Sequence, residues 1–251
     1  RLTEELRILE KDSGAYIPQV PFEDIGNGLC RFYLVSKQIS GIDIETLNRF
    51  FISTSNSISG NIQSFEEKLK IFKECCVDGD LPYRPEEAEA WLDEYRRRGY
   101  PPMHHSGEYK ALYSPAYRIV KLDYIHYLEI FRKIDSLLKS HDRILAAIDG
   151  SCGAGKSTLA ALMGDVYNCN IFHMDHFFLR PEQRTRERME ETGGNVDYER
   201  FREEVIDGIQ RGSEFKYRIY DCKKGLMDEY ITVRPKKLNI IEGAYSMHPA
   251  L

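Results

Sequence analysis

The chain has 251 residues, of which 42% are hydrophobic and 30% are charged, and its formal net charge is −5. This composition is ordinary for a globular protein and excludes collagen-like, low-complexity and wholly disordered chains. Acidic residues outnumber basic residues in both halves, which disfavours a dedicated nucleic-acid binder, and no apolar run reaches the roughly 18–20 residues that span a bilayer.

The first part of the chain carries helical patterns and no long strand pattern. Apolar residues recur every three or four positions in several stretches, among them residues 27–53. Pro85 is followed by two glutamates and marks a further helix start, because proline and acidic side chains suit the free amides of a first turn. We therefore predict an all-α domain of unknown function over residues 1–118 and a connecting helix over residues 119–142.

The pattern changes at Arg143. Three short apolar runs follow that are typical of buried parallel strands, and two further runs indicate a hairpin. Helical stretches lie between them, and this alternation predicts an α/β domain with a parallel sheet over residues 143–251. The expected strands are Ile144–Ile148, Asn170–Met174 and Leu238–Ile241, and the expected hairpin comprises Phe215–Tyr220 and Tyr230–Val233.

Residues 150–157 fit the phosphate-binding pattern GxxxxGK[ST], after the first expected strand and before a helix. The glycines let backbone amides turn towards phosphate oxygens, and the positive end of the helix faces the same anion. Lys156 would contact the β- and γ-phosphates, and Ser157 would ligate Mg²⁺. The alternative is an ordinary glycine turn before a helix. The predicted ATP-binding residues are Gly150, Ser151, Cys152, Gly153, Ala154, Gly155, Lys156, Ser157 and Thr158.

Two acidic residues follow strands that would end beside this loop. Asp175 comes directly after the second expected strand and is placed to orient and deprotonate the hydroxyl that a kinase phosphorylates. Glu242 follows the third expected strand, where a carboxylate can hold Mg²⁺ directly or through water. Each acid could instead cap a local turn or lie on the surface. His173 and His176 are spaced like metal ligands, but no further ligands stand nearby, which disfavours a zinc site.

The phosphate loop is followed by the segments MDHFF, GGNVDYERF, YRIYD and IIEG. In their order and spacing, these five motifs resemble the uridine kinase family, which includes nicotinamide riboside kinases and is related to phosphoribulokinase and pantothenate kinase. The likeness covers roughly residues 143–251. It implies a P-loop kinase fold of the α/β class.

The resemblance also implies roles for individual residues. Asp175 would be the catalytic base and help to organise Mg²⁺, and Glu242 would contribute to the metal site. Asp197 would bind ribose hydroxyls, since a carboxylate can accept two hydrogen bonds from a vicinal diol. Asp197 is also well placed to cap the helix that follows it. Phe178 and Tyr220 would lie near the substrate.

Some features of the sequence bear on the resemblance. Family members continue past the last motif with a lid that carries arginines, so we expect this chain to be a piece of a longer protein, truncated before the lid. We expect it to bind nucleotide but to turn over poorly or not at all, and to leave an open sheet edge at Ile144–Ile148. His176 and Phe178 differ from the residues that are commoner at these positions in the family, which weakens the case for uridine as the substrate.

Four basic side chains could clamp phosphate or form a solvated face with nearby glutamates: Arg180, Arg184, Arg186 and Arg188.

These observations predict a kinase that uses ATP and Mg²⁺ to phosphorylate a hydroxyl of a nucleoside-like or related metabolite. The alternative is a non-catalytic ATP sensor, which would not need a base at Asp175. Six cysteines without a CxxC pair predict free thiols and a cytoplasmic location. We expect a small-molecule hydroxyl acceptor as the partner, and neither nucleic acid nor a membrane. The oligomeric state and the identity of the acceptor stay open.

Overall fold

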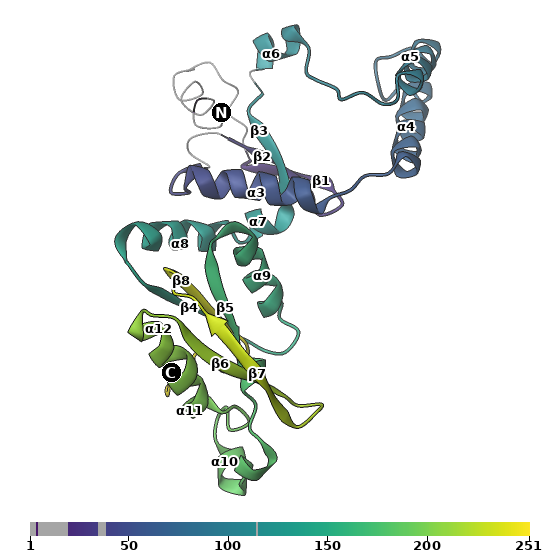
Figure 1. Ribbon diagram of the computed structural model, residues 1–251. Helices are drawn as coiled ribbons and strands as arrows, with labels where there is room; N and C mark the ends of the chain where they lie inside the picture. The colour runs from purple at the N-terminus through teal and green to yellow at the C-terminus, as the bar shows by residue number, and fades with distance from the viewer. Residues whose placement is uncertain (1–3, 5–19, 35–38, 114) are drawn as a thin grey trace. The chain divides into compact units, whose positions relative to one another are not determined.

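The computed structural model describes residues 4, 20–34, 39–113 and 115–251 (Figure 1). The chain divides into two compact units, the first made of Arg1–Gln38 and Thr54–Val120 and the second of Ile39–Ser53 and Lys121–Leu251. The second unit contains the predicted phosphate loop and the parallel sheet that supports it.

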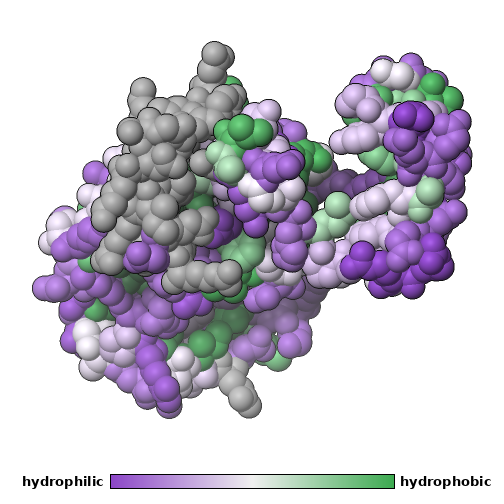
Figure 2. Space-filling model, turned by 90° about the horizontal axis from the view of Figure 1, so that it is seen from above, coloured by the Kyte–Doolittle hydropathy of each residue, from purple (hydrophilic) through white to green (hydrophobic). Residues whose placement is uncertain are grey.

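In the described part of the chain, no helix combines the length and the apolar composition that a membrane crossing needs. Hydrophilic residues make up most of the face shown in Figure 2, with small hydrophobic patches between them. The six cysteines are free thiols, and Cys152 in the predicted phosphate loop is among the exposed ones.

The first unit contains a three-stranded sheet in the order β1-β2-β3. Its strands are β1 (Phe22–Gly26), β2 (Leu29–Tyr33) and β3 (Tyr117–Lys121), and β1 pairs with β2 in antiparallel fashion. The prediction of an all-α domain over residues 1–118 is therefore wrong.

The hairpin between β1 and β2 explains the error. Residues 26–28 form its Gly-Asn-Gly turn with φ angles of 83°, 56° and 69°, which glycine and asparagine adopt most readily. Burial then alternates, with Cys30, Phe32 and Leu34 buried and the residues between them half-buried. The helical interpretation of residues 27–53 overlooked this turn, which is a strong hairpin signal, and the two-residue period that follows it.

Helices follow this hairpin, and they include the one predicted to begin at Pro85. Helix α4 (Ile62–Val77) is capped by Asn61, whose side chain accepts a hydrogen bond from the backbone nitrogen of Ser64 at 2.8 Å. Helix α5 (Pro85–Arg97) begins at the predicted proline and has basic residues in its last turn, as the helix dipole favours. A shorter helix, α6 (Gly107–Tyr113), precedes β3.

The segment predicted as one connecting helix over residues 119–142 is broken into three elements. β3 ends at Lys121, α7 (Leu122–His126) follows, and α8 (Leu128–Ser140) begins after a break at Tyr127. The sequence pattern gave the correct type of structure for most of this segment, but it did not show the strand or the break.

A buried carboxylate joins two helices and Tyr167 within the second unit. Asp135 on α8 accepts hydrogen bonds from the backbone nitrogen of Asp43 at 2.7 Å and from the hydroxyl of Thr46 at 2.8 Å. Asp43 and Thr46 lie at the start of α3 (Ile44–Ser57), whose residues up to Ser53 belong to this unit. The hydroxyl of Tyr167 donates to the same carboxylate at 2.9 Å. These bonds satisfy a carboxylate that would otherwise be costly to bury.

The parallel sheet has the order β4-β8-β5, so the third strand of this half lies between the first and the second and pairs in parallel with both. Its strands are β4 (Ile144–Ile148), β5 (Cys169–His173) and β8 (Leu238–Glu242), and all five residues of the central β8 are buried. Helix α9 (Lys156–Val166) connects β4 to β5. In the described residues, β4 has no strand partner beyond β8, so it forms one edge of this sheet.

A second layer packs on this sheet. The predicted hairpin is formed by β6 (Phe215–Asp221) and β7 (Leu226–Val233). A continuous helical stretch precedes it, made of α11 (Tyr198–Phe201), the π-helical segment η3 (Arg202–Ile206) and α12 (Asp207–Arg211). Side chains from the sheet, the hairpin, this stretch and the segment that follows β5 share one hydrophobic core, including Phe172, Phe177, Phe201, Val205, Phe215 and Ile241.

Short helical segments follow β5 and lead to α11. They are η1 (Met174–Phe177), η2 (Pro181–Gln183) and α10 (Arg186–Glu190).

The α/β fold with a parallel sheet is present as predicted. Its strands β4, β8 and β5 end at a common edge because they run in the same direction.

Candidate active site

The loop between β4 and α9 has backbone angles that suit a phosphate-binding loop. Gly150, Gly153 and Gly155 have φ angles of 142°, 76° and 80°, which residues with a Cβ rarely adopt. Helix α9 begins directly after the loop, so its free amides and its positive dipole end face the same space. Residues 150–155 are exposed, and the loop is therefore open to a ligand.

Lys156 is the first residue of α9, and its side chain folds back over the loop. Its Nζ atom donates a hydrogen bond to the backbone oxygen of Ser151 at 2.8 Å. An ammonium group has three donors, so this contact leaves two donors for an incoming anion. The structure thus puts a cation beside the exposed glycines, where the sequence pattern predicts phosphate binding.

Asp149, between β4 and the loop, was not singled out by the sequence analysis. Its carboxylate accepts hydrogen bonds from the backbone nitrogens of Gly150 at 2.7 Å, Tyr245 at 3.1 Å and Met247 at 3.0 Å. These bonds tie the first turn of the loop to the segment that follows β8. A local signal was present, because aspartate before a glycine turn often binds nearby backbone amides.

Glu242 links the loop helix to the end of β8. Its side chain is buried, and its Oε2 atom accepts a hydrogen bond from the hydroxyl of Ser157 at 3.1 Å. Glu242 is the register partner of Ile148 on β4 and of His173 on β5, so it stands at the carboxyl edge between the two outer strands. The structure therefore brings together Ser157 and Glu242, two of the three residues that the sequence analysis assigned to the metal site with Asp175.

His173 is the second partner of this carboxylate, a contact that the sequence analysis missed. Its Nδ1 atom lies 2.5 Å from Oε1 of Glu242. The ring of His176 stands 5.0 Å from that of His173, centroid to centroid. Burial lowers the pKa of His176, and the nearby His173 lowers it further, against smaller opposing effects of Asp175 and Glu242.

The donor set at Glu242 suits Mg²⁺ better than zinc. A carboxylate and a hydroxyl are hard oxygen ligands, and Mg²⁺ is usually bound by one or two carboxylates together with substrate phosphates. Within the described residues, no three His, Cys, Asp or Glu side chains cluster closely enough to hold a metal by themselves. Ser157 and Glu242 fit a metal ion that arrives with a nucleotide.

The predicted base lies near this edge. Asp175 is exposed in η1, two residues after His173 and therefore just beyond the end of β5. Phe178 is half-buried and forms an isolated antiparallel β-bridge with Val196. Tyr220 is buried on β6. The roles predicted for Asp175, Phe178 and Tyr220 toward an acceptor stay predictions.

Asp197 acts as a helix cap in the structure. It is buried at the start of α11, and one oxygen accepts a hydrogen bond from the backbone nitrogen of Arg200 at 3.1 Å. The other oxygen accepts from the side chain of Gln183 at 3.0 Å and faces the Arg200 guanidinium at 3.5 Å. The capping alternative is thus realised, and a ribose diol would have to displace Gln183 to reach this carboxylate.

The arginines between residues 180 and 188 bind protein groups. Arg184 donates to the backbone oxygen of Leu179 at 2.8 Å and 3.0 Å. Arg188 contacts both carboxylate oxygens of Glu199 at 2.6 Å and 2.7 Å and lies over the ring of Tyr198. These contacts hold the 179–199 segment in place, and they favour a structural role over a phosphate clamp.

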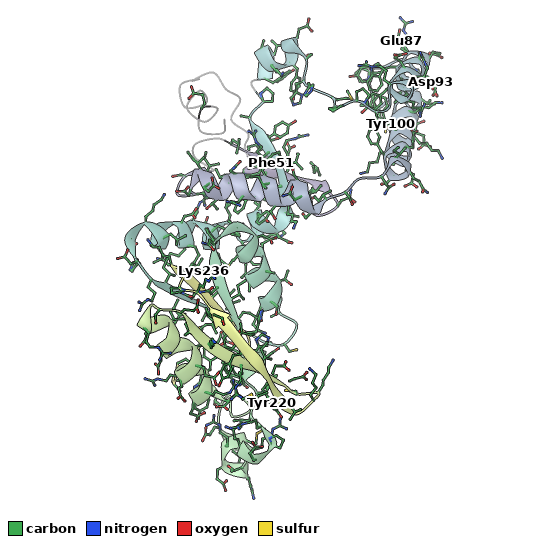
Figure 3. The ribbon with its side chains drawn as sticks, viewed as in Figure 1. Phe51, Glu87, Asp93, Tyr100, Tyr220 and Lys236 are labelled. Atoms are coloured by element: carbon green, nitrogen blue, oxygen red, sulfur yellow. The ribbon has the colours of Figure 1, made fainter. Side chains whose placement is uncertain are left out.

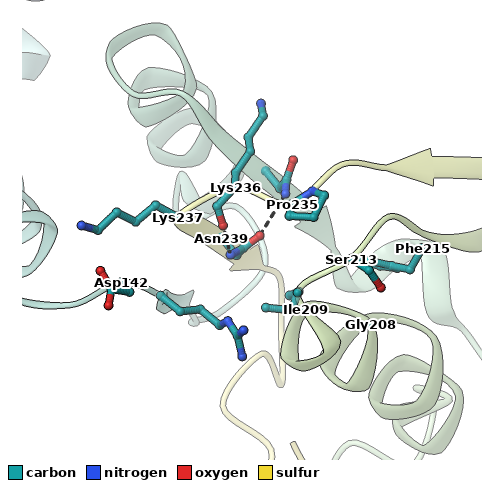
Figure 4. Close-up of a pocket in the computed structure, with 12 residues that line it drawn as sticks. Asp142, Gly208, Ile209, Ser213, Phe215, Pro235, Lys236, Lys237 and Asn239 are labelled. Carbon is teal, nitrogen blue, oxygen red and sulfur yellow. Dashed lines mark hydrogen bonds between the residues drawn. The ribbon is translucent and has the colours of Figure 1, made fainter.

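A pocket lies at the end of the parallel sheet opposite the phosphate loop (Figure 4). It has a volume of about 270 Å³ and is lined by residues at the starts of the strands, such as Arg143, Asn170 and Lys236. Figure 3 shows Lys236 and Tyr220 far apart in the second unit. Lys236 donates to the backbone oxygen of Cys169 at 2.8 Å, so its ammonium is engaged away from the phosphate loop.

Comparisons with known proteins find likeness in structure alone. No family model matches the chain, and no curated protein matches it. Among solved structures, the chain is similar to that of a possible uridine kinase from Bacillus stearothermophilus, with 19% sequence identity and a TM-score of 0.42. The likeness covers 51% of this chain and 75% of that chain. It is too slight to decide the substrate, which has to be argued from the residues themselves.

Proposed function

We propose that the chain is an ATP-dependent small-molecule kinase that transfers a phosphoryl group to a hydroxyl of a nucleoside-like or related metabolite. The observation that carries the proposal is the hydrogen bond between Ser157 and the buried Glu242. It joins the start of the loop helix to the carboxyl end of the adjacent strand, where Mg²⁺ and the phosphates of a nucleotide would meet.

The donor side of the proposed reaction is built by the loop and its neighbours. The amides of residues 150–155 and the ammonium of Lys156 would bind the phosphates, since they are donors grouped at one exposed turn. Ser157 and Glu242 would hold Mg²⁺. When bound, Mg²⁺ would neutralise charge on the β- and γ-phosphate oxygens.

Asp175 is the proposed base. The acceptor oxygen would form a bond to the γ-phosphorus while the bond from that phosphorus to the bridging oxygen of ADP breaks. The proton of the acceptor hydroxyl would pass to the Asp175 carboxylate, which is exposed and can receive it. A non-catalytic ATP sensor has no use for such a group, so Asp175 favours the kinase over the sensor.

The acceptor class is inferred from three residues beyond the loop. Asp197, Phe178 and Tyr220 stand in motifs that resemble those of uridine kinases, and we propose that they contact the acceptor. Because Asp197 already caps α11, its contact with a diol would require Gln183 to move. The hydroxyl groups of the acceptor would therefore replace the hydrogen bond that the Gln183 side chain donates to Asp197.

An acceptor screen tests the proposal. The protein is incubated with ATP and Mg²⁺ and with nucleosides, pantothenate or sugar phosphates in turn, and ADP is measured. The proposal predicts that ADP formation depends on one class of acceptor and yields an equal amount of phosphorylated product. ATP binding without acceptor-dependent ADP from any of these compounds would favour the sensor.

A further inference from the structure

We infer that His173 is a positioning residue that fixes the Glu242 carboxylate at the proposed Mg²⁺ site. The inference rests on the proposed function and adds a residue to which the sequence motifs give no role. His173 is the last residue of β5 and Glu242 is the last residue of β8, and the two are direct partners in the parallel ladder. The register of the sheet therefore places their side chains at the same edge.

The Glu242 carboxylate is held at both of its oxygens. Nδ1 of His173 lies 2.5 Å from Oε1, and the hydroxyl of Ser157 donates to Oε2 at 3.1 Å. Because a carboxylate accepts hydrogen bonds and does not donate them, this contact requires a proton on Nδ1 of His173. The side chain of Glu242 is 5% exposed, so water has little access to replace either partner.

The imidazole of His173 is itself restrained by neighbouring rings. The His176 ring contacts it edge-on, at an interplanar angle of 61° and a centroid distance of 5.0 Å. His176 in turn stacks with Tyr217 at an interplanar angle of 21°, and Arg200 donates to the backbone oxygen of His176 at 3.1 Å. The His173 side chain is 38% exposed, and its contacts with the His176 ring and the Glu242 carboxylate orient its imidazole.

Loss of the Nδ1 donor would free one carboxylate oxygen in a buried site. A buried acceptor without a partner is unfavourable, so Glu242 would turn towards another donor and leave its alignment with Ser157. Groups that orient a metal ligand typically contribute 10–100-fold to metal affinity or activity. The effect of His173 should therefore fall on the part of ATP binding that depends on Mg²⁺.

Three substitutions separate this role from simple packing. In His173→Asn, a side-chain amide nitrogen stands as many bonds from Cα as Nδ1 does, so the donor is kept. In His173→Gln, the amide nitrogen corresponds to Nε2, and in His173→Ala no donor remains. Calorimetric titration with ATP, in Mg²⁺ and in EDTA, gives the factor by which Mg²⁺ tightens binding. This factor should fall about 10–100-fold in the alanine and glutamine variants and stay near the wild-type value in the asparagine variant.

ATP affinity in EDTA should be the same for all four proteins, and thermal unfolding checks that each variant is folded. A wild-type Mg²⁺ effect that persists in His173→Ala would overturn the inference while leaving the proposed function in place. Equal losses in Mg²⁺ and in EDTA would assign His173 to packing. A wild-type chain that binds no ATP would overturn the proposed function and this inference with it.

A double variant tests the route of the effect. If His173 acts through Glu242, adding His173→Ala to Glu242→Gln should cause no further loss of the Mg²⁺ effect, because the carboxylate that it orients is already absent. A further loss of the size seen in the single variant would show that His173 acts on the site in another way, and would overturn the inference.

Discussion

Replacement of Lys156 by alanine should weaken ATP binding by about 10²-fold and leave the fold intact. In the structure the ammonium group uses one donor on the backbone oxygen of Ser151 at 2.8 Å, which leaves two for phosphate oxygens. A hydrogen bond to a charged group contributes about 1.5–3 kcal/mol, so two bonds at the lower value give about 3 kcal/mol. At about 1.4 kcal/mol for each tenfold change in Kd, this corresponds to about 10²-fold.

Lys236→Ala is the matched control for this experiment. Its ammonium group also donates to a backbone oxygen, that of Cys169 at 2.8 Å, but it lies beside the start of β8 at the opposite end of the sheet (Figure 4). Each variant loses one positive charge and one bond to the backbone. Calorimetric titration with ATP should separate the two by about 10²-fold, as worked out above. Equal ATP affinities would refute the assignment of the loop as a nucleotide site.

Asp175→Asn keeps the size of the side chain but removes the base, so ATP affinity should persist while acceptor-dependent ADP release falls by roughly 10²–10⁴-fold. Cys152 in the loop and Cys222 after β6 are both exposed, so ATP should slow the alkylation of Cys152 by iodoacetamide and leave Cys222 unaffected, as measured by peptide mass spectrometry. Gly243→Ala should lower the free energy of unfolding by about 1–3 kcal/mol, measured by chemical denaturation, from a strained backbone and overpacking. Its φ is 136°, and an added Cβ would lie 2.6 Å from Cβ of Met174.

Each of these predictions has a contrary outcome. Turnover of Asp175→Asn within a few-fold of wild type would place the base elsewhere. Equal protection of both cysteines, or of neither, would mean that ATP does not occupy the loop. Gly60 has open space around it and a φ outside the left-handed region, so Gly60→Ala is the control for Gly243→Ala. If the two alanine variants are equally stable, the close approach at Gly243 is not a constraint.

The parallel sheet and the phosphate loop could be predicted because their signals are local. The run Ile144–Ile148 coincides with β4, and Leu238–Ile241 is one residue shorter than β8. The loop pattern requires glycine at positions of unusual φ and lysine at the start of the next helix, so the residues that identify it lie close together in the sequence. In the first unit, the Gly-Asn-Gly turn at residues 26–28 was an equally local signal, and it was overlooked.

Contacts between distant segments could not be predicted in this way. His173 and Glu242 are 69 residues apart, and their pairing depends on the register of β5 against β8. Asp149 binds amides that lie 96 and 98 residues further along the chain. Asp197 is a different case, because its position before α11 suits both a helix cap and a ligand contact. The structure shows that the cap is made.

The central claim is that the protein transfers a phosphoryl group from ATP to a hydroxyl acceptor. A single-turnover experiment tests it most directly, with the protein in excess over γ-labelled ATP so that slow transfer is still detected. We predict that in Mg²⁺ the label moves from ATP to one class among nucleosides, pantothenate and sugar phosphates, one label for each ADP formed, and that Lys156→Ala abolishes the transfer. Bound ATP that stays intact with every acceptor would contradict the claim.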